Sequence, residues 1–403
     1  MAEVYNRGMK RFGTVLLYSA ISRDWSAEWE KIGCDKAVYA KLNLKVNSYR
    51  FWIKQVRAVV ANILKQEALS KGGEAVVSRE TMVNLDAKTD VLMSLNGDQL
   101  ERFCAGLKEQ PFQLPSLGRQ LLQTVEHYES SVHEQYPQIM GILNVTPDSF
   151  SDGGQYLSEQ AAVKHAQKMI IEGADIIDVG GESTRPGSKP VSTSEELQRV
   201  IPVIQALRRV NRSIQISIDT TKAAVAQKAI EAGATLVNDI SGGLFDSAIL
   251  KVVADCKVPY VIMHIPSRPE KMQDHVSYED LLSEVYGALS NRVEATLKAG
   301  ILRENLIVDP GIGFGKTTEQ NLALLHRIAV FKGLGCRVLV GTSRKRFIGE
   351  ILSKGEQDRC FGTAATLAIS IVHGVNIVRA HDVQAMKDVV RMAWAIRKES
   401  VNA

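Results

Sequence analysis

The sequence lacks the paired cysteines of a disulfide framework or a zinc site. Its five cysteines are odd in number and scattered, and none stands in a Cys-x-x-Cys pair or beside a His-x-x-x-His pair. Scattered single cysteines are typical of reduced thiols in the cytoplasm. We therefore expect a cytoplasmic protein with reduced thiols at Cys34, Cys104, Cys256, Cys336 and Cys360.

Long apolar runs and a strong charge of one sign are missing as well. No apolar stretch approaches the roughly 20 residues that span a bilayer. Residues 12–21 follow Lys10 and Arg11, but this apolar run contains Gly13 and has no clear cleavage site, so it predicts a buried strand and not a signal peptide. The formal charge of +4 over 403 residues indicates no nucleic-acid partner. We expect a soluble protein without nucleic-acid or membrane partners.

From residue 137 onward the sequence repeats one order: an apolar run, a polar or glycine-rich turn and a helix-period segment. Near-continuous apolar runs such as residues 260–263 are typical of parallel strands covered on both faces. Eight such units over roughly 260 residues favour a closed (β/α)8 barrel, and an open doubly wound sheet is the alternative. The expected strands are residues 138–143, 174–178, 214–218, 235–238, 259–264, 305–308, 337–340 and 376–379.

Residues 1–136 do not follow this repeat and are too long for a linker. They predict a small α+β domain of unknown role in front of a barrel domain of residues 137–403. The aromatic residues Trp25 and Tyr49 are expected to pack in this domain. Its expected elements are a strand at 12–21, an amphipathic helix over 52–64 that ends at Gly72-Gly73, apolar runs at 75–77 and 91–95, and helices at 98–108 and 117–128.

A polar residue follows every predicted barrel strand. Barrel enzymes bind substrates in these loops, although a single polar residue there could equally end a strand or cap a helix. Cationic side chains in the ring suit a phosphorylated ligand, and carboxylates and amides suit a flat nitrogen heterocycle. No Gly-x-Ser-x-Gly motif or strand-end cysteine supplies an activated nucleophile. The ring comprises Asn144, Asp178, Asp219, Asn238, Asp239, His264, Asp309, Ser343, Arg344, Lys345, Arg379 and His381, of which His264 is expected to be structural.

Five motifs, in this order, resemble dihydropteroate synthase of folate biosynthesis: residues 144–154, 178–187, 309–316, 343–345 and 379–383. The resemblance covers about residues 137–398, and a domain like the leading one accompanies some members of the family. It implies that (7,8-dihydropterin-6-yl)methyl diphosphate condenses with 4-aminobenzoate to give 7,8-dihydropteroate and diphosphate. It also implies that Mg2+ accompanies the diphosphate, and we expect a homodimer.

The resemblance also implies a role for individual residues, carried over by position. Asp219, Asn238, Asp309 and Lys345 would hold the pterin. Asn144, Thr184, Arg379 and His381 would hold the diphosphate, with Asn144 as the protein's contact to Mg2+. Arg185, Pro186, Phe314, Lys345 and Arg346 would border the 4-aminobenzoate, with the loop of residues 149–154 closing over it. The residues expected to be catalytic are Asp219, Asp309, Lys345, Arg379 and His381.

Two residues depart from the pattern of this family. Many members have serine where this chain has Arg346, next to the aminobenzoate carboxylate. Because a guanidinium can bind the same carboxylate in a forked geometry, we expect the role to persist with altered geometry. Ala380 replaces a more frequent valine, and its side chain is expected to point away from the ligand.

Two other functions stay open. A methyltransferase on the same barrel would pass a methyl group from a folate to a corrinoid. It would keep equivalents of Asp219, Asn238 and Asp309 but has no need for residues 343–345 or for the anion site of Arg379 and His381. A non-catalytic pterin or phosphate sensor has no need for loops at residues 149–154 and 184–187 that enclose a second substrate. These features favour the synthase.

Overall fold

The structure is a computed structural model that describes residues 15–19, 29–30, 32–145, 155–183, 190–272 and 276–399. The chain divides into two compact units, Met1–Ser130 and Ser131–Ala403. The second unit begins a few residues before position 137. Its first residues belong to it because Asn376 Nδ2 donates to the Val132 carbonyl at 2.6 Å and Arg397 Nη2 binds Glu134 at 2.6 Å.

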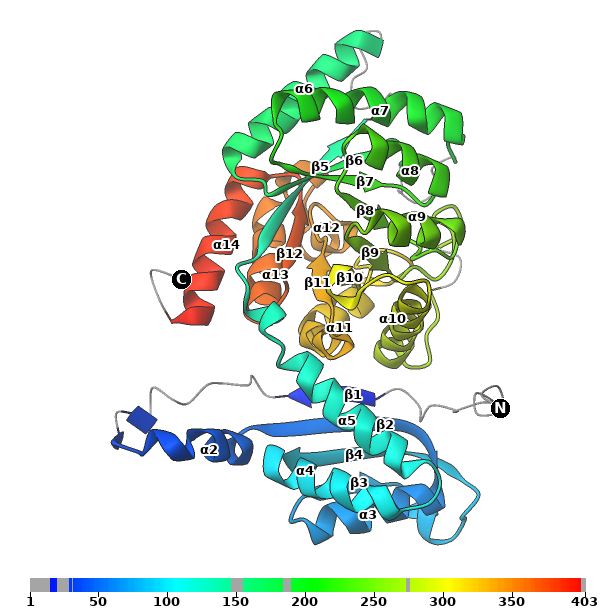
Figure 1. The fold of residues 1–403 in the computed structure, drawn as a ribbon, viewed down its shortest axis with the longest axis vertical. Coiled ribbons are helices and arrows are strands. Elements are labelled where there is room, and N and C mark those ends of the chain that lie inside the picture. Colours follow the sequence, from blue (N-terminus) through cyan, green and yellow to red (C-terminus); the bar gives the residue numbers. More distant parts are fainter. Residues whose placement is uncertain are drawn as a thin grey trace. The chain divides into compact units, whose positions relative to one another are not determined.

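The second unit is a closed barrel of eight parallel strands, in the order β10-β11-β12-β5-β6-β7-β8-β9 (Figure 1). This confirms the fold class, and each strand lies within two residues of its expected bounds. The strands are β5 (Gln138–Asn144), β6 (Ile176–Gly180), β7 (Gln215–Asp219), β8 (Leu236–Asp239), β9 (Tyr260–Met263), β10 (Leu306–Asp309), β11 (Arg337–Val340) and β12 (Ile377–Ala380).

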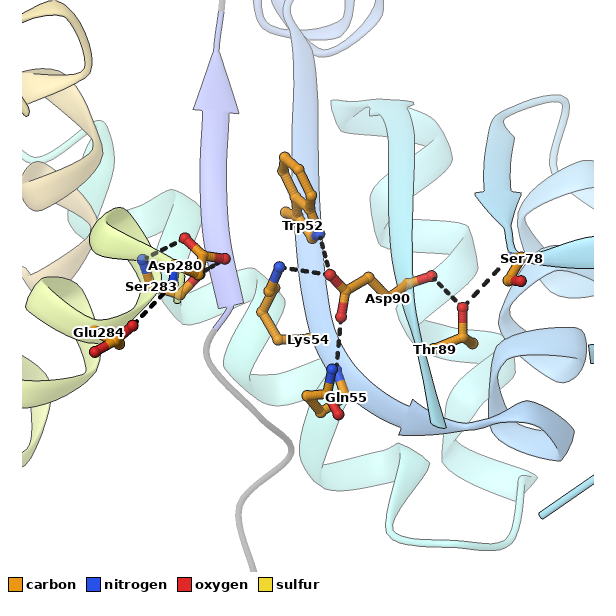
Figure 2. Close-up of polar contacts among 9 residues, drawn as sticks. All are labelled: Trp52, Lys54, Gln55, Ser78, Thr89, Asp90, Asp280, Ser283 and Glu284. Atoms are coloured by element: carbon orange, nitrogen blue, oxygen red, sulfur yellow. Dashed lines mark hydrogen bonds and ion pairs between the residues drawn. The ribbon is translucent and has the colours of Figure 1, made fainter. Parts of the chain in front are cut away.

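The helices of the barrel unit lie outside the ring of strands (Figure 1). Their ends follow local signals: Ser192 caps α7 by accepting from the Glu195 N–H, and Gly233 ends α8 at φ 118°. At the start of α10, Asp280 accepts from the Ser283 N–H while the Glu284 side chain accepts from the Asp280 N–H (Figure 2). Among the described helices, none is long and apolar enough to cross a membrane. The barrel helices are α6 (Gln155–Glu172), α7 (Thr193–Val210), α8 (Ala223–Ala232), α9 (Ala248–Cys256), α10 (Leu281–Lys298), α11 (Thr318–His326), α12 (Arg346–Leu352), α13 (Cys360–Val372) and α14 (Val383–Lys398).

One apolar layer fills the barrel, and a polar layer lies next to it. Side chains two positions apart on a strand point the same way. The polar residues that follow the apolar layer by two positions therefore share its direction, toward the carboxyl ends of the strands. The apolar layer is Met140, Ile176, Leu236, Val261, Ile307, Leu339 and Ile377, and its polar successors include Asp178, Asn238, Asp309 and Arg379.

The first unit is a four-stranded antiparallel sheet, in the order β1-β2-β4-β3, with helices. The helix predicted over residues 52–64 is wrong in its first half: the chain is a strand up to Arg57, and helix α3 begins at Ala58. Alternate burial of Tyr49, Phe51 and Ile53 is the period of a strand, and pairing with β4 stabilises it. The elements are β1 (Val15–Ser19), α2 (Tyr39–Val46), β2 (Ser48–Arg57), α3 (Ala58–Ser70), β3 (Glu74–Val77), β4 (Lys88–Asn96), α4 (Gly97–Gly106) and α5 (Leu114–Tyr128).

Polar contacts stabilise the irregular end of β2. Its register against β4 shifts between Ile53 and Val56, and Gln55 has φ 53°. Asp90 on β4 accepts from the Gln55 N–H at 3.0 Å, from Lys54 Nζ at 2.5 Å and from Trp52 Nε1 at 3.1 Å (Figure 2). One carboxylate thus replaces the ladder hydrogen bond that the bulge removes.

Of the two aromatic residues singled out in the leading domain, the structure describes Tyr49. Tyr49 is only 3% exposed and its hydroxyl donates to Glu129 at 2.5 Å, so it packs as expected. Trp25 lies outside the described residues.

Candidate active site

Arg379 lies at the centre of a polar network inside the mouth of the barrel. Its Nε donates to Asp178 Oδ2 at 2.6 Å, and its Nη2 donates to Asp219 Oδ2 at 2.8 Å. Asn238 Nδ2 donates to the same Asp178 oxygen at 3.0 Å. These residues come from β12, β6, β7 and β8, so the network spans the barrel interior and joins strands far apart in sequence.

The network combines buried acids with one cation. Burial, and then the neighbouring Asp178, raise the pKa of Asp219 to about 7, although Arg379 opposes the shift. Burial works against the guanidinium, but Asp178 and Asp219 outweigh it and raise the pKa of Arg379 above its usual value. Asp178 Oδ1 is buried without a hydrogen-bond partner among the described residues. The mouth therefore holds a fixed positive charge and acceptors that suit the N–H groups of a ligand.

Asp309 ends β10 and is held by the turn that follows it. Its Oδ1 accepts from the Gly311 N–H at 2.7 Å. Gly311 has φ 70°, and a Cβ there would lie 2.0 Å from the His264 carbonyl oxygen, so only glycine fits. Burial raises the pKa of Asp309 to about 6, against the opposing effects of the Gly311 N–H and Lys345. The turn thus orients a carboxylate that is ionised at neutral pH.

The buried Lys316 side chain binds the same loop, a role that the sequence did not indicate. Its Nζ donates to the carbonyls of Gly311 at 2.9 Å and Phe314 at 3.0 Å, and lies 3.1 Å from His264 Nδ1. Burial lowers the pKa of Lys316 to about 7, and burial together with Lys316 lowers the pKa of His264 to about 3. His264 is thus a neutral partner of a buried lysine, which agrees with the structural role expected for it.

An apolar surface lies beside these polar groups. Lys345 Nζ sits 4.0 Å from the centre of the Phe314 ring, a cation–π contact. Phe314 belongs to a cluster of buried residues that sequence reasoning also missed, although Ile240 and Met263 stand at the ends of strands. A planar ring could pack on this surface. The cluster is Ile240, Met263, Ile265, Met272 and Phe314.

His381 follows β12 and is oriented by Ser343. The Ser343 hydroxyl accepts from the His381 N–H at 3.1 Å and lies 3.0 Å from its Nδ1. Burial, and then Arg379 and Arg344, lower the pKa of His381 to about 4, so the ring is neutral at neutral pH. Arg344 itself binds Asp382 through Nε and Nη2, at 3.1 and 2.5 Å, so its charge is neutralised within the protein.

Asn144 and Arg346 are the remaining candidate residues that the structure describes. Asn144 ends β5, and a Cβ on Gly180 would lie 3.8 Å from Asn144 Oδ1 and 3.5 Å from Asp219 Cβ, so Asn144 is on the same rim. The Arg346 side chain is 85% exposed, and its Nε binds Glu350 Oε1 at 2.7 Å. Among the described residues, no group of three or more His, Cys, Asp or Glu side chains could hold a metal ion. Thr184, Arg185, Pro186 and residues 149–154 lie outside the described residues.

Comparisons with known proteins assign the chain that carries this rim to a family. Residues 140–381 match the family described as pterin binding enzyme. Dihydropteroate synthase from Synechocystis sp. is 50% identical over 259 residues, which are 64% of this chain and 89% of that protein. The structure of Xanthomonas albilineans dihydropteroate synthase with 4-aminobenzoic acid is 42% identical, has a TM-score of 0.61, and is matched over 65% of this chain and 94% of its own.

A longer relative also matches the leading domain. A probable bifunctional folylpolyglutamate synthase/dihydropteroate synthase from Halobacterium salinarum is 40% identical over 349 residues, which are 85% of this chain and 42% of that protein. Since residues 137–403 are only about two thirds of the chain, part of this match falls before them. The family match itself contains Asp178, Asp219, Asp309 and Arg379. The chain belongs to the pterin-binding enzymes and, within them, to the dihydropteroate synthases.

Proposed function

We propose that the barrel condenses (7,8-dihydropterin-6-yl)methyl diphosphate with 4-aminobenzoate, releasing 7,8-dihydropteroate and diphosphate. The observation that carries this proposal is the position of Arg379 between Asp178 and Asp219, on the rim that also bears Asp309 and His381. One mouth thus offers acceptors for a nitrogen heterocycle and, in Arg379, a cation for its departing anion. We propose Asp219, Asp309, Lys345, Arg379 and His381 as its catalytic residues.

The pterin ring is held by Asp219, Asn238, Asp309 and Lys345. A 2-aminopyrimidinone edge carries two parallel N–H donors, which match the two oxygens of a carboxylate. The Gly311 N–H orients the Asp309 carboxylate for this pairing. The apolar cluster around Phe314 offers a surface for the face of the ring.

The diphosphate is received by Asn144, Thr184, Arg379 and His381. Arg379 uses Nε and Nη2 for its two acids, which leaves the N–H groups of Nη1 to donate to the anion. Both acids hold the guanidinium still, which lowers the reorganisation needed when charge develops on the leaving group. The Ser343 hydroxyl orients the His381 ring at the same rim of the barrel.

Mg2+ fits the residues at Asn144. The Asn144 carboxamide oxygen is a hard donor at the end of β5, and Mg2+ is typically bound by few protein oxygens together with substrate phosphates. When bound there, the ion would neutralise part of the diphosphate charge. The protein's own contribution to that neutralisation comes from Arg379, while the neutral His381 ring can donate a hydrogen bond to the diphosphate.

The chemistry requires little proton abstraction. An arylamine is unprotonated at neutral pH, so its nitrogen can bond to the pterin methylene carbon without a strong general base. The carbon–oxygen bond to diphosphate breaks with its electron pair, and one amine proton is released. Departure of diphosphate is the costly step, and a preorganised donor such as Arg379 is typically worth about 3 to 4 kcal/mol. Asp219 and Asp309 stabilise the electron-poor pterin carbon.

The 4-aminobenzoate is bordered by Arg185, Pro186, Phe314, Lys345 and Arg346. Arg346 is exposed and bound to Glu350, so its contribution is expected to be modest. Replacing Arg346 with serine should raise the KM for 4-aminobenzoate about two- to fivefold with kcat unchanged, the range of an exposed ion pair. Glu350→Gln, which releases the guanidinium, should lower the same KM. If steady-state kinetics show no change in either variant, Arg346 has no part in this subsite.

One assay tests the function as a whole. The chain is incubated with the pterin diphosphate and labelled 4-aminobenzoate, with and without Mg2+, and dihydropteroate is measured. Product that depends on both substrates supports the synthase. Methylation of a corrinoid from a methylated folate in a parallel reaction would instead support the methyltransferase, and ligand binding without product in either reaction would support the sensor.

We further propose a cytoplasmic homodimer. Large apolar side chains are exposed on two adjacent helices of the barrel unit, and exposed apolar patches are typical of subunit interfaces. Helices α13 and α14 pack against each other and carry the exposed residues Phe361, Ile369, Met392 and Ile396.

The leading domain, taken as residues 1–130, stabilises the enzyme or shapes its assembly. Its partial match in the Halobacterium salinarum protein indicates that it accompanies the barrel elsewhere. A chain shortened to residues 131–403 should therefore melt at least about 2 to 4 °C lower or assemble differently from the full chain. Calorimetry and analytical ultracentrifugation measure both. An active, monodisperse short chain with unchanged melting and assembly would rule this role out.

A further inference from the structure

Lys222 bridges two acidic residues next to the active site. It follows Asp219 by three positions and stands directly before α8. Its Nζ binds Glu182, the second residue after β6, and Glu196 Oε2 on α7 at 2.5 Å. One ammonium group therefore joins the loop after β6, the loop after β7 and a helix.

The chain after β6 is held on its other side as well. Arg199 on α7 donates from Nη1 to the Gly181 carbonyl at 2.7 Å. A Cβ on Gly181 would lie 2.8 Å from Val200 Cγ1, so the backbone approaches α7 closely. Arg199 thus binds the backbone at Gly181, and Lys222 binds the side chain of Glu182.

Burial makes the Lys222 contacts stronger than those of a surface ion pair. The Glu196 side chain is 0% exposed, that of Lys222 is 23% exposed and that of Glu182 is 27% exposed. Partial burial opposes the charge of Lys222, but the hydrogen bonds of Glu182 and Glu196 outweigh it and raise its pKa. Water screens such a buried cluster less than an exposed one. The cluster therefore fixes the positions of Glu182 and Lys222 relative to α7.

The same residues line a cavity that reaches the active site. Its wall includes Glu182, Ser183, Asp219, Lys222, Ile240 and Arg268. The loop that begins at Glu182 and Ser183 continues in the sequence with Thr184, Arg185 and Pro186. Glu182 and Asp219 therefore line one cavity at the point in the sequence where this loop begins.

We propose that Lys222 is a positioning residue, which sets the start of the loop after β6 so that the loop can meet the diphosphate and the aminobenzoate. This inference rests on the proposed function, because the roles of Thr184, Arg185 and Pro186 come from it. Lys222 contacts neither substrate. It acts through Glu182, and Glu196 anchors it from the helix.

The test compares three variants of the full chain. Lys222→Met removes the bridge, and Lys222→Arg keeps a cation that can bind both acids. Lys228→Met is the matched control, because Lys228 lies on α8, the helix that Lys222 precedes, and among the described residues its Nζ binds the exposed Glu231 at 2.7 Å. For each variant we would measure the KM of both substrates, the melting temperature, and the Kd of 6-hydroxymethyl-7,8-dihydropterin, which carries no diphosphate.

Lys222→Met should raise the KM for 4-aminobenzoate about tenfold or more, since small displacements of positioning groups have effects of this size. The Kd of the pterin alcohol should stay within about twofold, because Asp219 and Asp309 are untouched. Lys222→Arg should recover most of the loss, and Lys228→Met should behave like the wild type. Should Lys222→Met fail to fold, Glu182→Gln should give the same pattern with a smaller effect.

Unchanged KM values in Lys222→Met would overturn the inference. An equal loss of pterin-alcohol affinity, or a lower melting temperature with unchanged kinetics, would also overturn it, because either result indicates a general structural role. A wild-type chain that forms no dihydropteroate would refute the proposed function instead. The two failures are therefore distinguishable in the same experiment.

Discussion

Replacing Arg379 with alanine is expected to lower kcat by about 10² or more, while 6-hydroxymethyl-7,8-dihydropterin still binds. The guanidinium is the fixed cation at the barrel mouth, held between Asp178 and Asp219, and in the proposed mechanism it meets the charge that grows on the departing diphosphate. Its effect on the pterin ring itself is indirect. Steady-state kinetics and calorimetry with the pterin alcohol separate these two contributions.

The variant also removes the partner of two acids, which requires a control. Arg379 opposes the rise in the pKa of Asp219, so its loss raises that pKa further, and pterin binding should be measured above pH 8, where Asp219 is more fully ionised. Arg397→Ala is the matched control, because the largely buried Arg397 forms an ion pair with the half-exposed Glu134 away from the rim. Undiminished diphosphate-dependent turnover in Arg379→Ala would refute the assigned role.

Asp309→Asn is expected to abolish measurable pterin binding, with a rise in Kd of about 100-fold or more. The asparagine amide presents a donor where the carboxylate presents an acceptor, so one of the two parallel hydrogen bonds to the pterin edge becomes a clash between donors. Asp309 is 7% exposed, so water cannot repair the mismatch. Isothermal titration calorimetry measures the loss, and undiminished affinity would contradict the role.

The pH dependence of the same binding supplies a second readout. Burial raises the pKa of Asp309 to about 6, so the carboxylate is ionised above that pH and protonated below it. A protonated carboxyl group cannot accept both N–H bonds, so wild-type affinity should begin to fall as the pH drops through about 7, where Asp219 is protonated, and should fall further through about 6 with Asp309. Asp255→Asn, at an exposed ion pair with Lys251, should keep this profile. A wild-type affinity that rises on acidification would contradict the proposed pairing.

The barrel could be predicted from the sequence because its signal is local. Each strand is a short apolar run, and four of the runs carry a polar residue two positions after a residue of the apolar layer, such as Asp178 after Ile176 and Arg379 after Ile377. The alternation of side chains along a strand then puts all these residues at one end of the barrel. In the leading domain, the helix predicted at Trp52 and Ile53 is wrong because strand β2 runs directly into helix α3. The period of two residues of the strand and the period of 3.6 residues of the helix overlap there.

The partners of those residues were decided by the tertiary structure alone. Asp178 and Arg379 are 201 positions apart, and no spacing along the chain predicts that one carboxylate binds both Arg379 and Asn238. The same holds for Lys316 with His264. The sequence by itself determined the order of the strands and the kinds of groups at their ends, because both depend on neighbours along the chain. Which groups pair, which pKa values shift and which loops are held depend on closure of the barrel, because only closure brings distant strands within hydrogen-bonding distance and removes water from between them.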